Sequence, residues 1–122
     1  MVELPGESFP RQRRLTRSRE YRAVFGDNFR VSDKNITILI GNPNIEGARI
    51  GFAVAKKQIR RAIDRSRLKR AFRESFRKHQ HRLPARDIVV MVRKKILDVD
   101  NRQINLCIEK HWKNIIRQCE NC

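Results

Sequence analysis

Basic side chains crowd the middle of the chain, and their type and spacing suit the binding of phosphate groups. Arginine outnumbers lysine there, and its planar guanidinium binds phosphate through two hydrogen bonds and stacks on bases. The cations are Arg60, Arg61, Arg65, Arg67, Lys69, Arg70, Arg73 and Arg77. Only Asp64 and Glu74 oppose them, whereas a solvated helix face usually mixes charges to form pairs along the helix. We interpret this segment as a surface that binds a polyanion.

The charge of the whole chain supports that interpretation. Its 122 residues include 29 Lys plus Arg and 13 Asp plus Glu, a formal net charge of +16. Such a positive field attracts polyanions, and nucleic acid is the leading partner. An anionic membrane is the other candidate, but the chain has no apolar run of spanning length, and residues 1–10 lack a signal-peptide core. We therefore expect a cytoplasmic protein with no membrane partner.

The sequence shows no grouping typical of a catalytic site. It has no apparent Ser, His and Asp set, acidic metal cluster or phosphate loop, so we expect no cofactor or metal on the protein and no RNA cleavage by this chain alone. Cys119 and Cys122 form a C-x-x-C pair without a second pair or a suitably spaced His, which favours two thiols in a tail over a zinc site. His111 is expected on the surface of the last helix.

The element that must position the basic segment is a long central helix. From residue 59 to about residue 79 the apolar residues have helical spacing. At 100° per residue, Leu68, Phe72 and Phe76 fall on one side, and most of the cations project from the other. The periodicity therefore predicts a helix with a buried aromatic face, so we place both of these Phe rings, together with Trp112 of the last helix, in the core.

Shorter patterns predict a helix near each end of the chain. The first covers about residues 17–25 after half a cap signature at Ser18, with Leu15, Tyr21, Val24 and Phe25 on its inner face. The last follows a capping-box pattern that begins at Asp100. Its inner stripe is Ile104, Ile108, Trp112 and Ile115.

Runs of β-branched residues predict the strands. Residues 35–40 and 48–55, separated by a turn-rich stretch, are expected to form an antiparallel hairpin with a long loop. Residues 29–31 add a short strand beside the hairpin, and residues 87–92 form a buried strand. The order α-β-β-β-α-β-α predicts one α+β RNA-binding domain, with residues 1–12 and 118–122 as flexible tails.

The residues from Arg49 to Arg77 resemble the signature of the protein subunit of bacterial ribonuclease P. In that family a strand ends in paired lysines, here Lys56 and Lys57, and a helix follows that bears Arg-Asn-Arg and then Lys-Arg. The corresponding residues are Arg65-Ser66-Arg67 and Lys69-Arg70. The resemblance extends outward to Arg14-Leu15, Glu20-Tyr21 through Val24-Phe25, Leu83-Pro84-Ala85, Asp87, Asp100-Asn101-Arg102 and Trp112, and so covers nearly the whole chain outside the two tails.

The resemblance implies a ribosomal-protein-like sandwich, in which a four-stranded sheet packs against helices and a left-handed crossover joins two parallel strands. It also implies a subunit that contacts a catalytic RNA with the central helix and holds the 5′ leader of precursor tRNA in a cleft between the first helix and the sheet. The implied RNA-binding residues are Arg60, Arg61, Arg65, Ser66, Arg67, Lys69, Arg70 and Arg73. The implied leader-binding residues are Arg14, Arg17, Tyr21, Phe25 and Lys56.

Some of these assignments have alternatives. Ser66 stands where the family has Asn, so it keeps a hydroxyl but loses an amide that donates and accepts together. Spacing alone favours Tyr21 and Phe25 as core residues, and only the resemblance places them in the cleft; we expect each ring to be partly buried.

The resemblance further implies a division of labour. Magnesium ions held by the RNA perform phosphodiester hydrolysis, while the protein, a monomer on its own, binds the leader and neutralises charge. A ribosomal or RNA-assembly protein with no part in catalysis is the alternative function, and a stand-alone nuclease is a third. All of these bind RNA, so a gel shift does not separate them.

Overall fold

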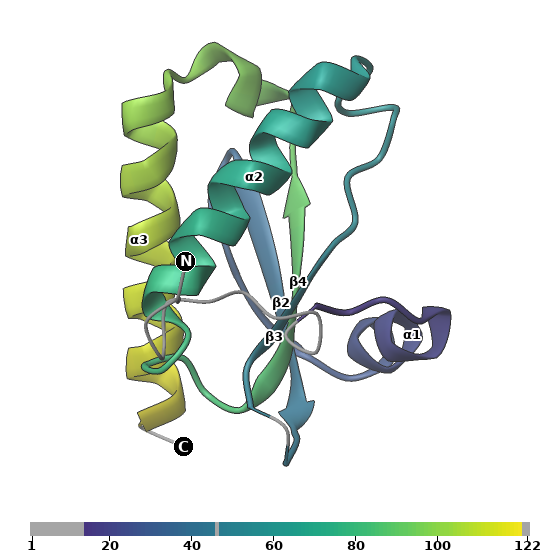
Figure 1. Cartoon of the computed structure of the whole chain (residues 1–122), viewed down its shortest axis with the longest axis vertical. Helices are drawn as coiled ribbons and strands as arrows, with labels where there is room; N and C mark the ends of the chain where they lie inside the picture. The colour runs from purple at the N-terminus through teal and green to yellow at the C-terminus, as the bar shows by residue number, and fades with distance from the viewer. Residues whose placement is uncertain (1–13, 46, 121–122) are drawn as a thin grey trace, which may run out of the picture.

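The computed structural model describes residues 14–45 and 47–120, which form an α+β sandwich (Figure 1). The helices are α1 (Ser18–Gly26), α2 (Ala62–His79), the short 3-10 helix η2 (Lys94–Asp98) and α3 (Asn101–Glu120). The strands are β1 (Phe29–Ser32), β2 (Ile36–Pro43), β3 (Arg49–Phe52) and β4 (Arg86–Val92). The predicted order of helices and strands is confirmed, and η2 is an addition between β4 and α3.

The order of the strands differs from the prediction. The sheet runs β1-β2-β4-β3, with β2 antiparallel to both of its neighbours and β3 parallel to β4. The predicted hairpin of residues 35–40 with 48–55 is therefore wrong, because β4 lies between the two segments. Ile88, Val89 and Val90 of β4 are each 0% exposed, and a strand so completely buried must pair its backbone groups on both edges. Residues 29–31 do pair beside β2, as expected.

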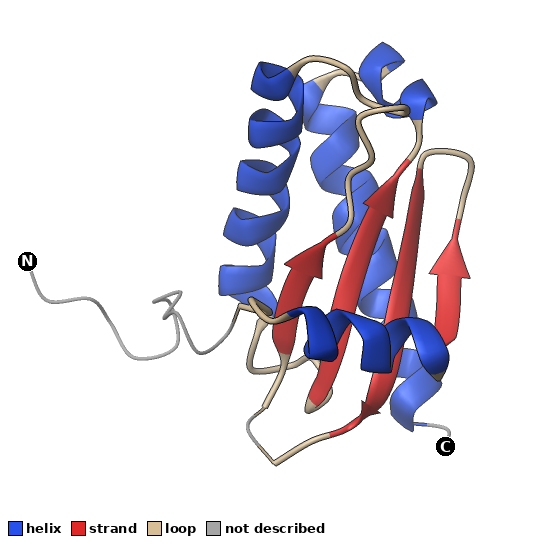
Figure 2. Cartoon of the chain, turned by 90° about the vertical axis from the view of Figure 1, so that its right-hand side faces the viewer, coloured by secondary structure: helices blue, strands red, loops and turns tan. Residues whose placement is uncertain are grey.

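The parallel strands β3 and β4 are joined through α2. In Figure 2 β3 is the leftmost arrow and β4 is the next, both point upward, and α2 lies behind them on the left. The connection is therefore left-handed, against the strong preference for right-handed crossovers. This geometry agrees with the expectation drawn from the family resemblance.

The helices cover both faces of the sheet: α2 and α3 pack on one face, and α1 lies across the other (Figures 1 and 2). On the first face Phe72, Phe76 and Trp112 are each 0% exposed, as predicted. The Trp112 ring lies edge-on to both Phe rings, at centroid distances of 6.4 Å and 6.3 Å, and its indole N–H donates to Ser75 Oγ at 2.8 Å. The predicted inner stripe of α3 is confirmed as buried. On the other face a smaller core joins α1 to the sheet through Leu15, Val24, Leu39 and Val89.

The helix boundaries deviate from the predictions by a few residues. The Glu20 carboxylate, rather than Ser18, caps the start of α1, because it accepts the backbone N–H of Thr16 at 3.1 Å and of Arg17 at 2.8 Å. The long helix begins at Ala62 instead of residue 59. At α3 the carboxylate of Asp100 accepts the N–H of Gln103 at 2.9 Å, in agreement with the predicted cap. Residues 118–120, expected in a flexible tail, continue α3, whereas residues 1–12, 121 and Cys122 lie outside the described residues.

The prediction of a surface position for His111 is wrong. The side chain is buried at 4% exposure, and its Nε2 lies 2.9 Å from Oδ2 of Asp33, in the turn between β1 and β2. His111 follows Ile108 by three residues and precedes Ile115 by four, which places it on the buried stripe of α3. Burial raises the pKa of Asp33, but hydrogen bonds from two backbone N–H groups and from His111 outweigh burial and leave that pKa below its ordinary value.

None of the helices in the described residues combines the length and the apolar character needed to cross a membrane.

Candidate nucleic-acid interface

The predicted RNA-binding residues share one side of α2 and the turn that leads into it, and we call them the basic surface. Arg60, Arg61, Ser66, Arg67 and Arg70 are exposed, and Arg65, Lys69 and Arg73 are half-buried. Leu68 and Phe72 lie on the opposite, buried side of the helix. The structure therefore separates cations from core along α2 as the periodicity predicts.

Few acids neutralise the basic surface. Asp64 lies 3.8 Å from Arg61 and 3.9 Å from Arg67, and both of these arginine side chains are largely exposed, so solvent screens the pairs. Glu74 pairs with Arg77 instead, at 3.0 Å. Within the described part of the chain, Lys69 and Arg70 make no ion pair, so their charges remain available to an external anion.

Arg65 has a structural task within this surface. Its Nη1 donates to the backbone carbonyls of Ile59 and Arg60, both at 2.8 Å. These bonds tie the segment before α2 to the first turn of the helix. One end of the guanidinium therefore holds the backbone that positions the neighbouring arginines.

A basic recess of about 530 Å³ lies beside the middle turns of α2. Its lining is Arg14, Ser66, Lys69, Arg70, Arg73 and Glu74. Arg73 is the most constrained of these, since its guanidinium carbon lies 5.4 Å from the ring centre of Phe52, and its Nε is buried without a hydrogen-bond partner in the described residues. Burial lowers the pKa of Arg73, and the nearby charge of Arg14 lowers it further. A desolvated cation beside another cation is stabilised by an anion, so the recess suits a phosphate group.

Tyr21 is anchored on the other face of the sheet, where α1 crosses β3. Its hydroxyl accepts the backbone N–H of Phe52 at 3.1 Å and donates to the carbonyl of Leu15 at 3.3 Å. The ring lies so close over Gly51 that a Cβ there would be 2.6 Å from the hydroxyl oxygen. Only glycine admits this approach, and Tyr21 is half-buried, as expected.

Phe25 lies one turn further along α1 and is 47% exposed, so its predicted place on the inner face of the helix is wrong. Four residues of helix turn through about 400°, which sets Phe25 about 40° away from Tyr21 around the helix. Val24 instead packs on the sheet, at 2% exposure. The ring of Phe25 is therefore accessible to a partner.

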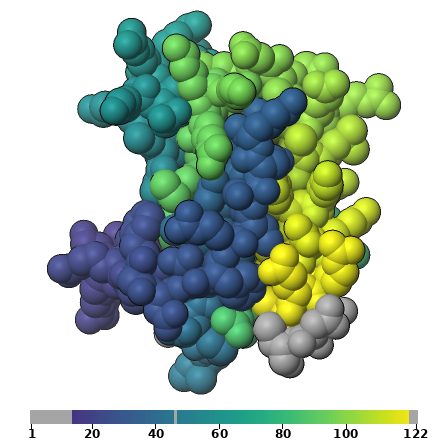
Figure 3. Space-filling model, turned by 180° about the vertical axis from the view of Figure 1, so that it is seen from behind, coloured from purple at the N-terminus to yellow at the C-terminus, as the bar shows by residue number. Residues whose placement is uncertain are grey.

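A sheet groove of about 330 Å³ begins at Phe25. Its lining is Phe25, Arg30, Thr37, Leu39, Gln58, Met91, Val92 and Arg93. In Figure 3 the surface is hollowed between α1, in purple, and the teal segment that leads into α2. An apolar floor with a ring at one end and arginines at the rim suits single-stranded RNA, which stacks on aromatic rings while cations contact its backbone.

Most of this groove was missed from the sequence. Of its residues, only Phe25 was predicted. Thr37 and Leu39 lie two residues apart on β2 and so share a face of the sheet, as do Val89 and Met91 on β4. This spacing is the one feature of the sequence that could have indicated the groove. The other predicted leader-binding residues lie elsewhere: Arg14 lines the basic recess, and Arg17 and Lys56 are exposed outside the residues that line the sheet groove.

An ion-pair network fixes α1 against the strands. Arg49 of β3 binds both oxygens of Asp87 on β4 at 2.8 Å and, through Nη1, an oxygen of Glu20 on α1 at 2.9 Å. These side chains are only 15–16% exposed, so the pairs are poorly screened. The Asn44 amide also donates to Asp87 at 2.8 Å. The network sets the position of α1, and therefore of Tyr21 and Phe25, on the sheet.

Through Glu20, the docking of α1 is expected to depend on pH. Burial raises the pKa of Glu20, but hydrogen bonds from the backbone of Arg17 and Thr16, with the charge of Arg49, outweigh burial and leave it below the ordinary value of 4.5. A carboxylate with a depressed folded pKa contributes stability that is present above the ordinary pKa and is lost as the pH falls. We expect stability to decrease below pH 4.5 more steeply in the wild type than in Glu20→Gln. Urea unfolding across pH 3 to 6 measures both slopes, and equal slopes would contradict this role of Glu20.

In the described part of the chain, no three His, Cys, Asp or Glu side chains gather closely enough to hold a metal ion. Cys119 is half-buried against the core, and its predicted partner in the C-x-x-C pair, Cys122, lies outside the described residues.

Comparison with known families identifies relatives along almost the entire chain. The model of the family described as Ribonuclease P matches residues 9–116. The chain is 42% identical over 115 residues to the ribonuclease P protein component of Thioalkalivibrio sulfidiphilus, covering 94% of this chain and 96% of the relative. It is 44% identical over 118 residues to that of Yersinia enterocolitica, covering 97% of each chain.

Solved structures show the same fold. The RNase P protein of Staphylococcus aureus superposes with a TM-score of 0.75 at 27% identity, covering 84% of this chain and 94% of that one. The RNase P protein of Thermotoga maritima gives a TM-score of 0.74 at 28% identity, covering 84% of this chain and 96% of the other.

Proposed function

This chain belongs to the ribonuclease P protein family, and from that premise we propose that its basic surface binds the catalytic RNA while its sheet groove holds the 5′ leader of precursor tRNA. The chain is a protein component of a ribonucleoprotein endoribonuclease that acts in tRNA processing. The observation that carries the finer assignment is the pair of surfaces: a cationic helix side with few counter-ions, and an apolar groove that begins at an exposed ring.

The protein contributes binding and charge, and the RNA contributes the reaction centre. Magnesium ions bound by the RNA supply the chemistry of phosphodiester hydrolysis. The basic surface reduces repulsion where RNA phosphates converge, and Arg73, a cation without a carboxylate partner in the described residues, suits a phosphate at the recess. The sheet groove holds the leader and leaves the tRNA body to the RNA. The protein itself remains a monomer in this proposal.

Reconstitution tests this function. The purified protein is mixed with a bacterial ribonuclease P RNA and precursor tRNA at low magnesium, and the 5′ ends of the products are mapped. We expect mature 5′ ends only when both components are present. A ribosomal or RNA-assembly protein would bind RNA without this activity, and cleavage by the protein alone would indicate a nuclease.

Replacing Arg70 with alanine is expected to weaken RNA binding and to flatten its salt dependence. Arg70 is exposed, lines the basic recess and has no ion-pair partner in the described residues. Loss of one phosphate contact lowers the slope of log affinity against log salt by roughly 0.7 to 0.9. Filter binding at several salt concentrations measures the slope. Arg117→Ala on α3 is the matched control, and an unchanged slope with a lowered thermal midpoint would make Arg70 a structural residue instead.

Replacing Phe25 with alanine is expected to weaken binding of precursor tRNA by the reconstituted enzyme and to leave mature tRNA unaffected. Stacking on an aromatic ring is worth about 1 to 3 kcal/mol per base, and only the precursor has a leader to stack. Affinities for precursor tRNA, mature tRNA and the catalytic RNA are compared at one salt concentration. Leu106→Ala, which removes another exposed apolar side chain on α3, serves as the control. Equal losses of affinity for precursor and mature tRNA would show that the leader does not bind in this groove.

A further inference from the structure

A separate groove of about 370 Å³ lies between α2 and α3. Its floor contains Ala71 and Ser75, small side chains one turn apart on α2, and Ile104 of α3. These small residues leave space where large neighbours such as Phe72 close the helix interface elsewhere. This α2/α3 groove shares Arg67 and Arg70 with the basic surface and lies on the face of the sheet opposite the sheet groove.

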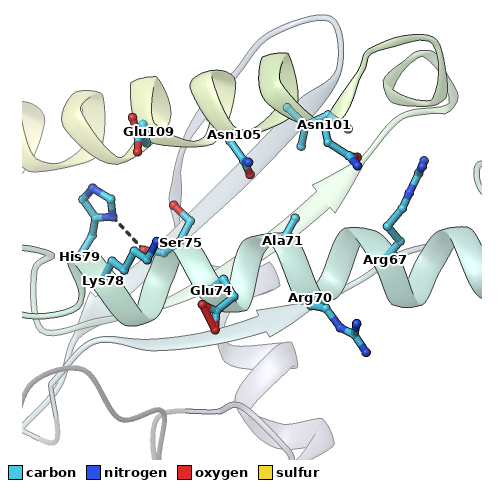
Figure 4. Close-up of a pocket in the computed structure, with 11 residues that line it drawn as sticks. Arg67, Arg70, Ala71, Glu74, Ser75, Lys78, His79, Asn101, Asn105 and Glu109 are labelled. Carbon is cyan, nitrogen blue, oxygen red and sulfur yellow. Dashed lines mark hydrogen bonds between the residues drawn. The ribbon is translucent and has the colours of Figure 1, made fainter. Parts of the chain in front are cut away.

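Two side-chain amides of α3 face this space. Figure 4 shows Asn101 and Asn105 pointing from α3 toward α2. Neither amide makes a hydrogen bond within the described residues, and the carboxylate of Glu109 lines the same wall one turn further on. An amide donates and accepts together, and a carboxylate accepts from an amino group. An apolar floor beside such a wall matches a nucleobase, which has an apolar face and a polar edge.

The ends of the groove carry the charges that a nucleotide backbone needs. Arg67 lies at one end, with Asp64 only at 3.9 Å, and Lys78 lies at the other end (Figure 4). Glu74 at the rim is already paired with Arg77. Because the chain has a net charge of +16, RNA is favoured as the occupant over a peptide that carries little negative charge.

We propose that the α2/α3 groove binds one unpaired nucleotide of the catalytic RNA, with its base against Ala71 and Ile104 and its edge on Asn101 and Asn105. Adenine, cytosine and guanine each carry an amino group on this edge, a donor that the amide oxygens of Asn101 and Asn105 can accept. The phosphates on either side of this nucleotide lie toward Arg67 and Lys78. This inference rests on the proposed function, because it takes the catalytic RNA as the partner.

Chemical probing of the reconstituted complex tests the proposal. Dimethyl sulfate and kethoxal modify the pairing edges of unpaired adenine, cytosine and guanine, so a base held in the groove is protected. We expect the wild-type protein to protect at least one base that becomes reactive again with the double variant Asn101→Ala/Asn105→Ala. The same variant is expected to lose about tenfold in affinity for the RNA. Asn114→Ala, elsewhere on α3, is the matched control and should behave as wild type.

The conservative variant Asn105→Asp keeps the shape of the side chain and removes its donor, so it tests the groove if the double variant does not fold. It should restore reactivity at the same base. The proposal is overturned if both variants show the same footprint and the same RNA affinity as the wild type. That result would also be obtained if the groove bound a peptide instead of RNA. If the wild-type protein fails to support cleavage by the RNA, the proposed function fails; if it supports cleavage while the groove variants match it, only this inference fails.

Discussion

Replacing Phe72 with alanine is expected to lower the free energy of unfolding by about 3 to 5 kcal/mol. Phe72 is 0% exposed, and its ring lies edge-on to Phe52 and Trp112 at centroid distances of 6.2 Å and 6.4 Å. The truncation leaves a cavity between α2, α3 and β3. The neighbouring rings of Phe52 and Trp112 are held by their own packing and do not move to fill it. This loss is a large part of the roughly 5 to 15 kcal/mol that stabilises a typical domain. Urea unfolding followed by circular dichroism measures it.

Ile63→Ala is the matched control for that experiment, because Ile63 lies on the same helix and is 66% exposed. Its effect should stay within about 0.5 kcal/mol. A Phe72→Ala protein that kept its unfolding midpoint and lost RNA binding would show that the aromatic side of α2 faces RNA. The assignment of the two helix faces would then be reversed.

The second large effect is expected at Arg49. Arg49→Ala leaves the carboxylates of Asp87 and Glu20 poorly solvated and without their shared cation, and breaking such a pair costs roughly 2 to 4 kcal/mol. Because Glu20 belongs to α1, the loss also releases the helix that carries Phe25. We expect lower stability together with weaker binding of precursor tRNA, and little change for the catalytic RNA, which binds α2 in the proposed function.

Two further variants show whether geometry or charge is responsible. Arg49→Lys keeps the cation, but a single ammonium group does not reproduce the bidentate bond to Asp87 together with the bond to Glu20. It should therefore retain only part of the stability. Thermal unfolding and tRNA affinity are measured for both variants. If Arg49→Ala unfolds at the wild-type midpoint and binds precursor tRNA normally, the network does not position α1.

Local chemistry explains what the sequence determined. Helix periodicity placed Phe72, Phe76 and Trp112 in the core, and separated them from the cations of α2, because side chains three or four residues apart share a helix face. Composition alone pointed to a polyanion. The arrangement of Lys56, Arg65, Arg67 and their neighbours then indicated the family, which the comparisons confirmed.

Contacts between distant segments were decided by the tertiary structure. Strand periodicity shows which face of a strand is buried but not which strand lies beside it, so the insertion of β4 between β2 and β3 was missed. Arg49 and Asp87 are 38 residues apart, and His111 and Asp33 are 78 apart, and no local pattern predicts either pair. The sheet groove and the α2/α3 groove are each lined by side chains from elements that become adjacent only when the sheet and its helices pack together. Burial and backbone pairing act on the whole chain at once, so no local stretch of sequence predicts either groove.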